Sequence, residues 1–198
     1  MAEVVLFHSV LGLRPGVIAA AERLRAAGHT VHAPDYFDGE VFDDLDDGSR
    51  KAEALGDREI ARRTSEAVAG LPAGLVFAGF SLGAVHAELL AASRPGALGA
   101  VLMCGAVPVE GLVESFGVER WPKGVPVQVH YAARDPWVEA GEVAALGGAV
   151  EGAGAAFEEH VYPGSGYLFV DPDLPGYDLA SSEEMWRRVL AFLYRVDA

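Results

Sequence analysis

The sequence contains little cysteine, few basic residues and no long hydrophobic run. Its single cysteine, Cys104, cannot form a disulfide within the chain, which fits a reducing compartment, and we expect it to be a small core residue. The 15 lysines and arginines face 29 acidic residues, and the formal net charge of −14 argues against binding to nucleic acid or to an anionic membrane. The apolar run at residues 4–7 is too short to cross a bilayer and follows no basic segment, so we expect a cytoplasmic protein.

The remaining composition is that of one folded domain. Hydrophobic residues make up 51% of the 198-residue chain and charged residues 22%, which is enough apolar material to bury a core. The chain has no repeat, low-complexity segment or interdomain linker. We therefore expect a single domain over residues 1–198 that acts on a small-molecule substrate without a cofactor or metal, in an oligomeric state that the sequence leaves open.

Short apolar runs alternate with helical segments along most of the chain. The runs at residues 4–7 and 30–33 are typical of buried strands, and a helix expected over residues 15–27 lies between them, which makes a βαβ unit with parallel strands. Further strands are expected at residues 75–78, 100–104, 126–130 and 157–162. The pattern predicts an α/β fold with a mostly parallel sheet of about six strands and helices on both faces.

Two stretches interrupt this pattern. Residues 34–48 contain turn residues and an acidic cluster (Asp43, Asp44, Asp46 and Asp47), which lacks calcium-loop spacing and a nearby histidine, so we expect a solvated loop there. Residues 107–124 have no clear periodicity and are expected to form a long connection, of the kind that acts as a lid or as a wall of a substrate site.

The stretch Gly79-Phe80-Ser81-Leu82-Gly83 follows one buried strand and precedes a helix of small residues. This G-x-S-x-G arrangement is typical of a nucleophile elbow, in which a serine hydroxyl projects from a sharp turn while the two glycines let strand and helix approach closely. The backbone N–H of Leu82, at the positive end of the helix, would then contribute to an oxyanion hole.

Ligand sites in open parallel sheets lie at the carboxyl ends of the strands. His8, Ser81, Asp135 and the turn at residues 164–167 all follow predicted strands and are therefore expected to lie close together. The chain order of a serine, then an aspartate, then a third group is the order found in α/β hydrolases.

Several further motifs accompany the elbow: Leu11-Gly12, Pro34-Asp35, Arg134-Asp135-Pro136-Trp137, Tyr162-Pro163-Gly164 and Phe169. Together they resemble the dienelactone hydrolase family of compact α/β hydrolases over essentially the full length. The resemblance implies an α/β-hydrolase fold and the hydrolysis of esters or lactones through a nucleophile, an aspartate and a histidine. It also implies that the amide of Val10 joins that of Leu82 in the oxyanion hole.

The sequence departs from this family at two positions. Ser81 stands where well-known members carry cysteine, and Tyr167 stands where the final turn of the family carries the catalytic histidine. A serine hydroxyl needs a base with a pKa near neutrality, whereas the usual tyrosine pKa of about 10 leaves only about one phenol in a thousand ionised at pH 7. The predicted triad of Ser81, Asp135 and Tyr167 is therefore atypical.

Three explanations remain open. Another histidine supplies the base, with His8 the best placed because its strand is expected beside the nucleophile strand, and His130 the next. Alternatively, Ser81 with the amides of Leu82 and Val10 polarises a carbonyl while Tyr167 acts as acid or base in a non-hydrolytic cyclisation, isomerisation or elimination. Finally, the chain could be a degenerate hydrolase that serves as a binding protein.

We favour a serine hydrolase that acts on an ester or lactone of a small, largely apolar substrate. Aromatic side chains near the predicted strand ends and in the long connection are expected to bind such a substrate. These are Phe37, Phe116, Trp121 and Trp137.

Overall fold

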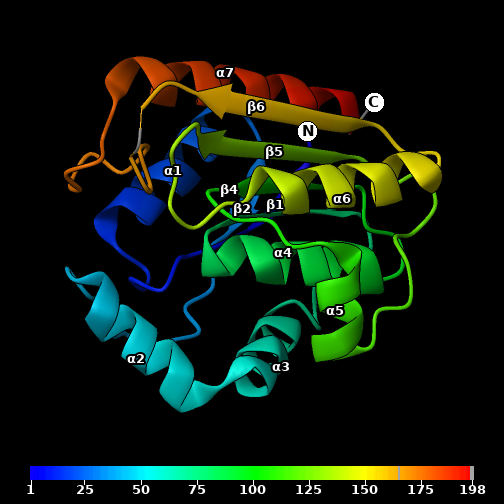
Figure 1. The fold of residues 1–198 in the computed structure, drawn as a ribbon, viewed down its shortest axis with the longest axis horizontal. Helices are drawn as coiled ribbons and strands as arrows, with labels where there is room; N and C mark the ends of the chain where they lie inside the picture. Colours follow the sequence, from blue (N-terminus) through cyan, green and yellow to red (C-terminus); the bar gives the residue numbers. More distant parts are fainter. Residues whose placement is uncertain (165, 197–198) are drawn as a thin grey trace.

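The computed structural model of the chain describes residues 1–164 and 166–196, so Ser165 of the final turn and the last two residues of the predicted domain lie outside the described part. A six-stranded sheet runs through the molecule in the order β2-β1-β3-β4-β5-β6, and every neighbouring pair is parallel (Figure 1). The strands are β1 (Glu3–Phe7), β2 (Thr30–His32), β3 (Leu75–Phe80), β4 (Gly99–Met103), β5 (Val127–Ala132) and β6 (Phe157–Tyr162). The predicted parallel sheet is confirmed.

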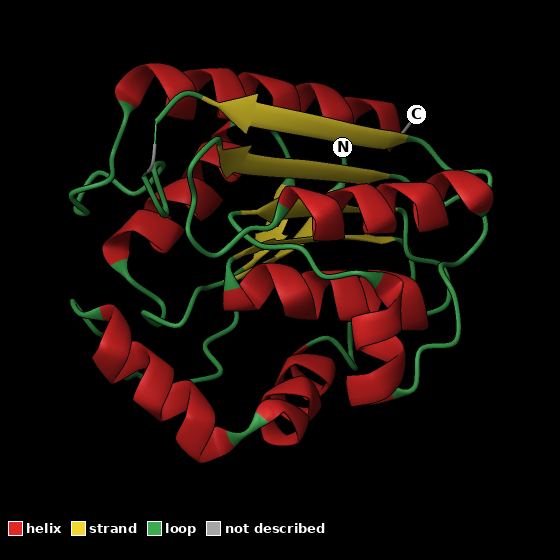
Figure 2. Cartoon of the chain, viewed as in Figure 1, coloured by secondary structure: helices red, strands yellow, loops and turns green. Residues whose placement is uncertain are grey.

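Helices cover both faces of this sheet (Figure 2). They are α1 (Pro15–Ala26), α2 (Leu45–Leu55), α3 (Asp57–Ala67), α4 (Leu82–Ser93), α5 (Val109–Phe116), α6 (Ala140–Gly152) and α7 (Leu179–Val196). The buried side chains of α1 and α7 pack on one face, and those of α3, α4, α5 and α6 pack on the other. Within the described ranges no helix has the length and the apolar character needed to span a membrane.

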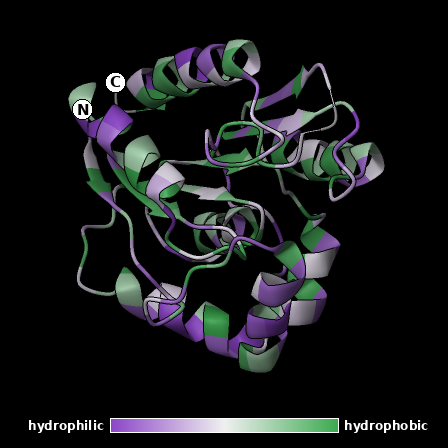
Figure 3. Cartoon of the chain, turned by 90° about the vertical axis from the view of Figure 1, so that its left-hand side faces the viewer, coloured by the Kyte–Doolittle hydropathy of each residue, from purple (hydrophilic) through white to green (hydrophobic). Residues whose placement is uncertain are grey.

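The central strands β1, β3 and β4 are almost entirely apolar because both of their faces are buried. In β1, Val5 and Phe7 belong to the core under α4, whereas Val4 and Leu6 belong to the core under α1 and α7, and all four are fully buried. Figure 3 shows hydrophobic colour in the middle of the sheet and alternating colours along the outer helices, of which α7 is amphipathic. This burial on both faces is the reason that the predicted strands read as continuous apolar runs.

Two helices lie where the sequence predicted loops. Asp44 caps α2 by accepting hydrogen bonds from the backbone amides of Asp46 and Asp47, so the acidic cluster is a helix start, where negative charge is favourable, rather than a solvated loop. The stretch at residues 107–124 contains α5, a short helix that buries Val109 and Leu112. The buried residue of α2 is Gly48, and those of α5 are Val109 and Leu112, so the apolar periodicity of both segments is weak.

The last helix, α7, starts at Leu179. Asp178 accepts a hydrogen bond from the Ser181 amide and so satisfies a backbone donor of the first turn.

The turn from β3 into α4 depends on two glycines. A Cβ atom at Gly83 would lie 2.3 Å from the carbonyl oxygen of His8 and 2.5 Å from that of Phe7. A Cβ atom at Gly79 would lie 2.1 Å from the carbonyl oxygen of Gly83. The first turn of α4 therefore packs directly against the backbone at the end of β1, and only glycine permits this approach.

We expect Gly83→Ala to lower the free energy of unfolding by about 1–3 kcal/mol, because the added methyl group overlaps two backbone carbonyls that cannot move independently. Urea denaturation monitored by circular dichroism measures this change. The matched control is Gly148→Ala in α6, where a Cβ meets no atom within 4 Å and where the better helix propensity of alanine should leave stability equal or higher. Equal stability of the two variants would contradict the steric role of Gly83.

Candidate active site

Ser81 occupies the sharp turn between β3 and α4. Its backbone has φ 52° and ψ −115°, a conformation that is rare for a residue with a side chain. The turn is held on both sides, since the Ser81 N–H donates to the carbonyl of Met103 at 2.8 Å and the Ser81 carbonyl accepts from the Ala84 N–H at 2.8 Å. The serine is thus positioned at the carboxyl ends of β3 and β4, as a nucleophile elbow requires.

The side chains of Tyr167 and Ser81 lie close together. Burial raises the pKa of Tyr167 well above its usual value, and the neighbouring Ser81 side chain acts in the opposite direction. The nearby Cys104 and Asp135 raise this pKa further. Tyr167 is therefore neutral at physiological pH and cannot serve as a phenolate base.

Asp135 lies in the turn after β5 and is 6% exposed. Its Oδ1 accepts a hydrogen bond from the Trp137 N–H at 3.0 Å, whereas its buried Oδ2 has no hydrogen-bond partner within the described part of the chain. Burial raises the pKa of this carboxyl group, and the Trp137 amide lowers it. The structure thus brings Ser81, Tyr167 and Asp135 together, with one carboxylate oxygen left free of protein partners.

His8 is fully buried at the end of β1, and both of its ring nitrogens have partners other than Ser81. Nδ1 lies 2.7 Å from the carbonyl oxygen of Ser9, and Nε2 accepts from the Tyr36 N–H at 3.3 Å and lies 3.5 Å from the Asp35 carboxylate. The ring stacks on Tyr36 with centroids 3.7 Å apart. Burial lowers the pKa of His8 to about 4, so the ring is neutral and holds the Tyr36 segment in place.

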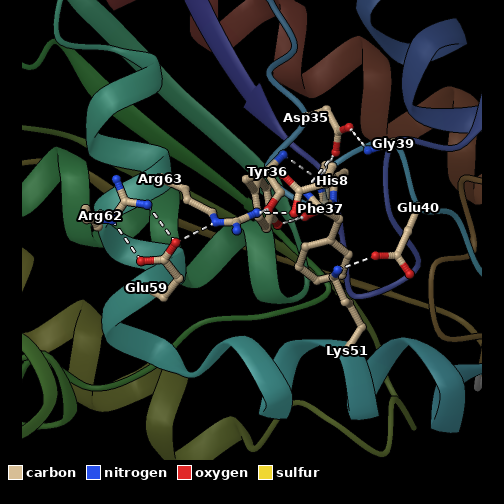
Figure 4. A network of polar contacts seen from close by, with 11 residues as sticks. His8, Asp35, Tyr36, Phe37, Gly39, Glu40, Lys51, Glu59, Arg62 and Arg63 are labelled. Carbon is tan, nitrogen blue, oxygen red and sulfur yellow. Dashed lines mark hydrogen bonds and ion pairs between the residues drawn. The ribbon is translucent and has the colours of Figure 1, made fainter.

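The network around His8 extends to the outer helices (Figure 4). Arg63 of α3 donates to the carbonyl of Tyr36 at 3.1 Å and to Asp38 at 2.7 Å, and it also bonds Glu59 within its own helix. Lys51 of α2 pairs with Glu40. These contacts fasten the loop at residues 35–40, which forms one side of the site, to α2 and α3.

His130 is also engaged elsewhere. Its Nδ1 lies 2.9 Å from the hydroxyl of Tyr162 and its Nε2 lies 2.8 Å from Oε1 of Gln128. Complete burial lowers its pKa well below the usual value. Both histidines that the sequence offered as a base are therefore neutral, buried and hydrogen-bonded to other groups.

The two residues predicted for the oxyanion hole lie on adjoining segments. Leu82 is the first residue of α4, and Val10 is in the turn that follows β1. The contact of Gly83 with the His8 carbonyl draws this turn against the start of α4. A hydrogen bond from the Leu11 N–H to the hydroxyl of Ser9, at 3.1 Å, fixes the turn from within.

The four aromatic residues predicted to bind substrate occupy different environments. Trp137 is 62% exposed and lies edge to face with Tyr167 at a centroid distance of 6.4 Å, and Phe116 lines a pocket that begins at Leu82. Phe37, in contrast, is completely buried against His8. Trp121 is a core residue that precedes β5, at the amino ends of the strands and so opposite Ser81, where its indole N–H donates to Val125. The last two therefore stabilise the fold and do not face the candidate site.

Tyr36 is a further residue beside the site. Its ring stacks on His8 and its hydroxyl donates to the His8 carbonyl, and burial, with a smaller effect of the nearby Tyr167, raises its pKa well above the usual value. The sequence feature that could have identified Tyr36 is its position after the end of a predicted strand, directly behind the Pro34-Asp35 pair. No group of three metal-ligating side chains occurs among the residues described.

The chain matches the profile of the dienelactone hydrolase family over residues 1–196. No curated protein sequence matches it. Among solved structures, it is similar to a dienelactone hydrolase-like promiscuous phosphotriesterase from metagenomic libraries, with 21% identity, a TM-score of 0.77, and coverage of 99% of this chain and 87% of that one.

Two further structures have the same architecture. A thermophilic esterase from Thermogutta terrifontis is 18% identical with a TM-score of 0.64, covering 98% of this chain and 84% of that one. The α/β hydrolase domain-containing protein 10 from mouse is 11% identical with a TM-score of 0.71, covering 98% of this chain and 90% of that one. At these identities the likeness establishes the α/β-hydrolase fold.

One further titratable group lies near the elbow, and sequence reasoning did not find it. Glu88 of α4 is completely buried, with Oε2 accepting from the Val107 N–H at 3.1 Å and Oε1 without a partner among the described residues. Burial raises its pKa to about 8. A glutamate in a helix of small apolar residues was the available signal, because it falls on a face that should be buried.

We expect the pH dependence of stability to reflect Glu88. The folded protein keeps the proton on this carboxyl group up to about pH 8 while the unfolded chain releases it near the usual pKa of about 4.3, so Glu88 lowers stability as pH rises between these values. In the wild type, Glu88 should lower the free energy of unfolding by an amount on the order of 3 kcal/mol between pH 5 and pH 8, as measured by urea unfolding. Glu88→Gln should remove this decrease. Glu151→Gln, at an exposed position of α6, should keep the wild-type profile. Identical profiles for all three proteins would refute this role.

Proposed function

The chain belongs to the dienelactone hydrolase family of α/β hydrolases, and on that premise we propose that it hydrolyses an ester or lactone of a small, largely apolar substrate through Ser81. The observation that carries the proposal is the conformation of Ser81 at the β3–α4 turn, together with the position of the Tyr167 side chain beside it. A serine in this strained turn at the carboxyl end of a parallel sheet has no structural purpose that alanine or glycine would not serve better.

The neutral phenol of Tyr167 suggests how a proton is moved without a histidine. As the Ser81 oxygen attacks the carbonyl carbon, its proton passes to the Tyr167 oxygen, and Tyr167 passes its own proton to the leaving oxygen. The carbon–oxygen bond of the ester then breaks, and an acyl group remains on Ser81. Water reverses the relay in the second step, so Tyr167 carries no net charge at any stage, in agreement with its raised pKa.

The amides of Leu82 and Val10 stabilise the oxyanion in this scheme. The tight contact between Gly83 and the His8 carbonyl supports it, because it holds the two backbone segments in a fixed relation before substrate arrives. A relay through a phenol is less effective than an imidazole base, so we expect slow turnover. Substrate binding and the oxyanion hole alone accelerate such a reaction by a factor of about 10³ to 10⁴ over the rate in water.

A second function is favoured by one observation, the raised pKa of Tyr167. A phenol that holds its proton firmly is suited to donate a hydrogen bond or a proton to a substrate carbonyl in an isomerisation, cyclisation or elimination. Such chemistry would need Tyr167 but no covalent bond to Ser81. The two functions therefore differ in which of the two residues is indispensable.

We expect Ser81 to react with an alkyl fluorophosphonate and Ser81→Ala to abolish both this labelling and the turnover of p-nitrophenyl acetate. Mass spectrometry of the labelled peptide and an absorbance assay measure the two effects. Ser93→Ala is the matched control, since Ser93 lies at the far end of α4 and bonds only the backbone of its own helix.

Each outcome separates the candidate functions. Absence of labelling together with absence of ester turnover would overturn the hydrolase proposal and leave a binding role. Full activity of Ser81→Ala on a carbonyl substrate, with complete loss in Tyr167→Phe, would establish non-hydrolytic chemistry.

We expect Tyr167→His to raise kcat/KM on activated esters by roughly tenfold or more. An imidazole at this position would act as a base of suitable pKa, and the buried Oδ2 of Asp135 is available to orient it. Tyr177→His, in the same loop but 37% exposed, should have no effect. An unchanged rate in Tyr167→His would mean that the hydroxyl relay has replaced the triad geometry altogether.

A further inference from the structure

A pocket of about 250 Å³ begins at the residue next to Ser81. Leu82, Val85 and His86 are spaced so that they share one face of α4, and they form one wall. Val107 and two residues of α5, Leu112 and Phe116, face them from the other side. Asp57 of α3 completes the lining, and Figure 1 shows α3 and α5 on the side of α4 that is turned away from the sheet.

Most of the residues that line the pocket are apolar, and the buried ones carry no charge. His86 is 1% exposed, and burial lowers its pKa to about 4, so its ring is neutral at physiological pH. Its Nδ1 has no hydrogen-bond partner among the residues that the structure describes. The polar lining residues Asp57 and Ser115 are exposed and lie at the mouth, where the carboxylate disfavours an anionic ligand. Such a lining favours a hydrocarbon group.

Tyr167 is not among the residues that line the pocket, and Tyr36 lies near both. The Tyr36 ring lies 6.2 Å from that of His86, which in turn lies 6.1 Å from Phe116. A group that protonates the leaving oxygen must stand on the leaving-group side of the reacting carbonyl. The remainder of the substrate, the acyl part, is then directed away from Tyr167 toward Leu82 and Phe116.

We propose that the pocket between α4 and α5 holds the acyl chain of the substrate, an uncharged hydrocarbon chain of up to about eight carbons. This inference rests on the proposed hydrolysis at Ser81, because the position of the leaving group defines which end of the substrate is the acyl end. The chain length follows from the volume of about 250 Å³ at roughly 30 Å³ for each heavy atom.

Gly111 of α5 offers a way to fill the pocket without disturbing the fold. It lines the pocket, and a Cβ atom there would meet only the Cβ of Val107, at a normal contact distance of 3.9 Å. Gly111→Leu should therefore occupy the space meant for the acyl chain. Gly148→Leu on α6, where the surroundings are open, is the matched control for a glycine-to-leucine change in a helix.

The experiment compares two series of esters. In the first, p-nitrophenyl esters carry acyl chains from two to ten carbons, and in the second, acetate is esterified with alcohols of increasing length. We expect kcat/KM of the wild type to rise with acyl length to about eight carbons. Gly111→Leu should lose at least roughly tenfold on the octanoyl ester and less than about twofold on acetyl esters, whereas Gly148→Leu should follow the wild type. The acyl assignment would be overturned if Gly111→Leu kept the wild-type dependence of kcat/KM on acyl length. It would also be overturned if kcat/KM of this variant fell with the length of the alcohol and not with that of the acyl chain.

A binding measurement separates failure of this inference from failure of the proposed hydrolysis. If the wild type hydrolyses no ester, straight-chain methyl ketones replace the esters, because their binding requires no reaction. The thermal midpoint of the wild type should then rise more with 2-decanone than with acetone, and Gly111→Leu should lose this difference. A wild type that does not respond to ketone length would refute the acyl pocket on its own.

Discussion

The backbone at the end of β1 packs directly against the backbone of the first turn of α4, where Gly83 lies against the carbonyls of Phe7 and His8. This contact fixes where Ser81 lies relative to the turn that carries Val10. It also sets the place of the His8 ring, since the His8 carbonyl that touches Gly83 accepts the hydroxyl of Tyr36 as well. Three segments that are far apart in the sequence thus meet around a single peptide unit, and the site is assembled from them.

The electrostatics of the site favour neutral groups. Burial keeps the proton on Tyr167 and raises the pKa of Cys104 to about 12, and it removes the proton from His8. Asp135 is the acidic group beside Tyr167, and its own pKa is raised. With Tyr167 in place, a relay of protons between hydroxyl groups suits this site, because it leaves each side chain uncharged.

The sheet, the helix after the elbow and the position of Ser81 could be predicted because they depend on local patterns: apolar runs, helix stop signals and glycine spacing. The helices α2 and α5 were missed because each buries only one or two residues, so no clear apolar periodicity marks them in the sequence. The role of His8 could not be read from its place after a strand, because it depends on Tyr36 and Asp35, which arrive from the β2 loop. Phe37 and Trp121 were misassigned for a related reason, since an aromatic residue near a strand end can point into the core as readily as into a cleft.

The loop at residues 35–40 is attached to the rest of the molecule in a different manner from the strands. Its ties to α2 and α3 are ion pairs of Lys51 and Arg63 with carboxylates that are largely exposed to solvent. Interactions of this type weaken as counterions accumulate, whereas the buried sheet is little affected. The outer part of this loop, at Asp38 and Glu40, should therefore loosen at a lower free energy than the sheet and by an amount that depends on ionic strength, whereas the buried Tyr36 and Phe37 remain packed beside His8.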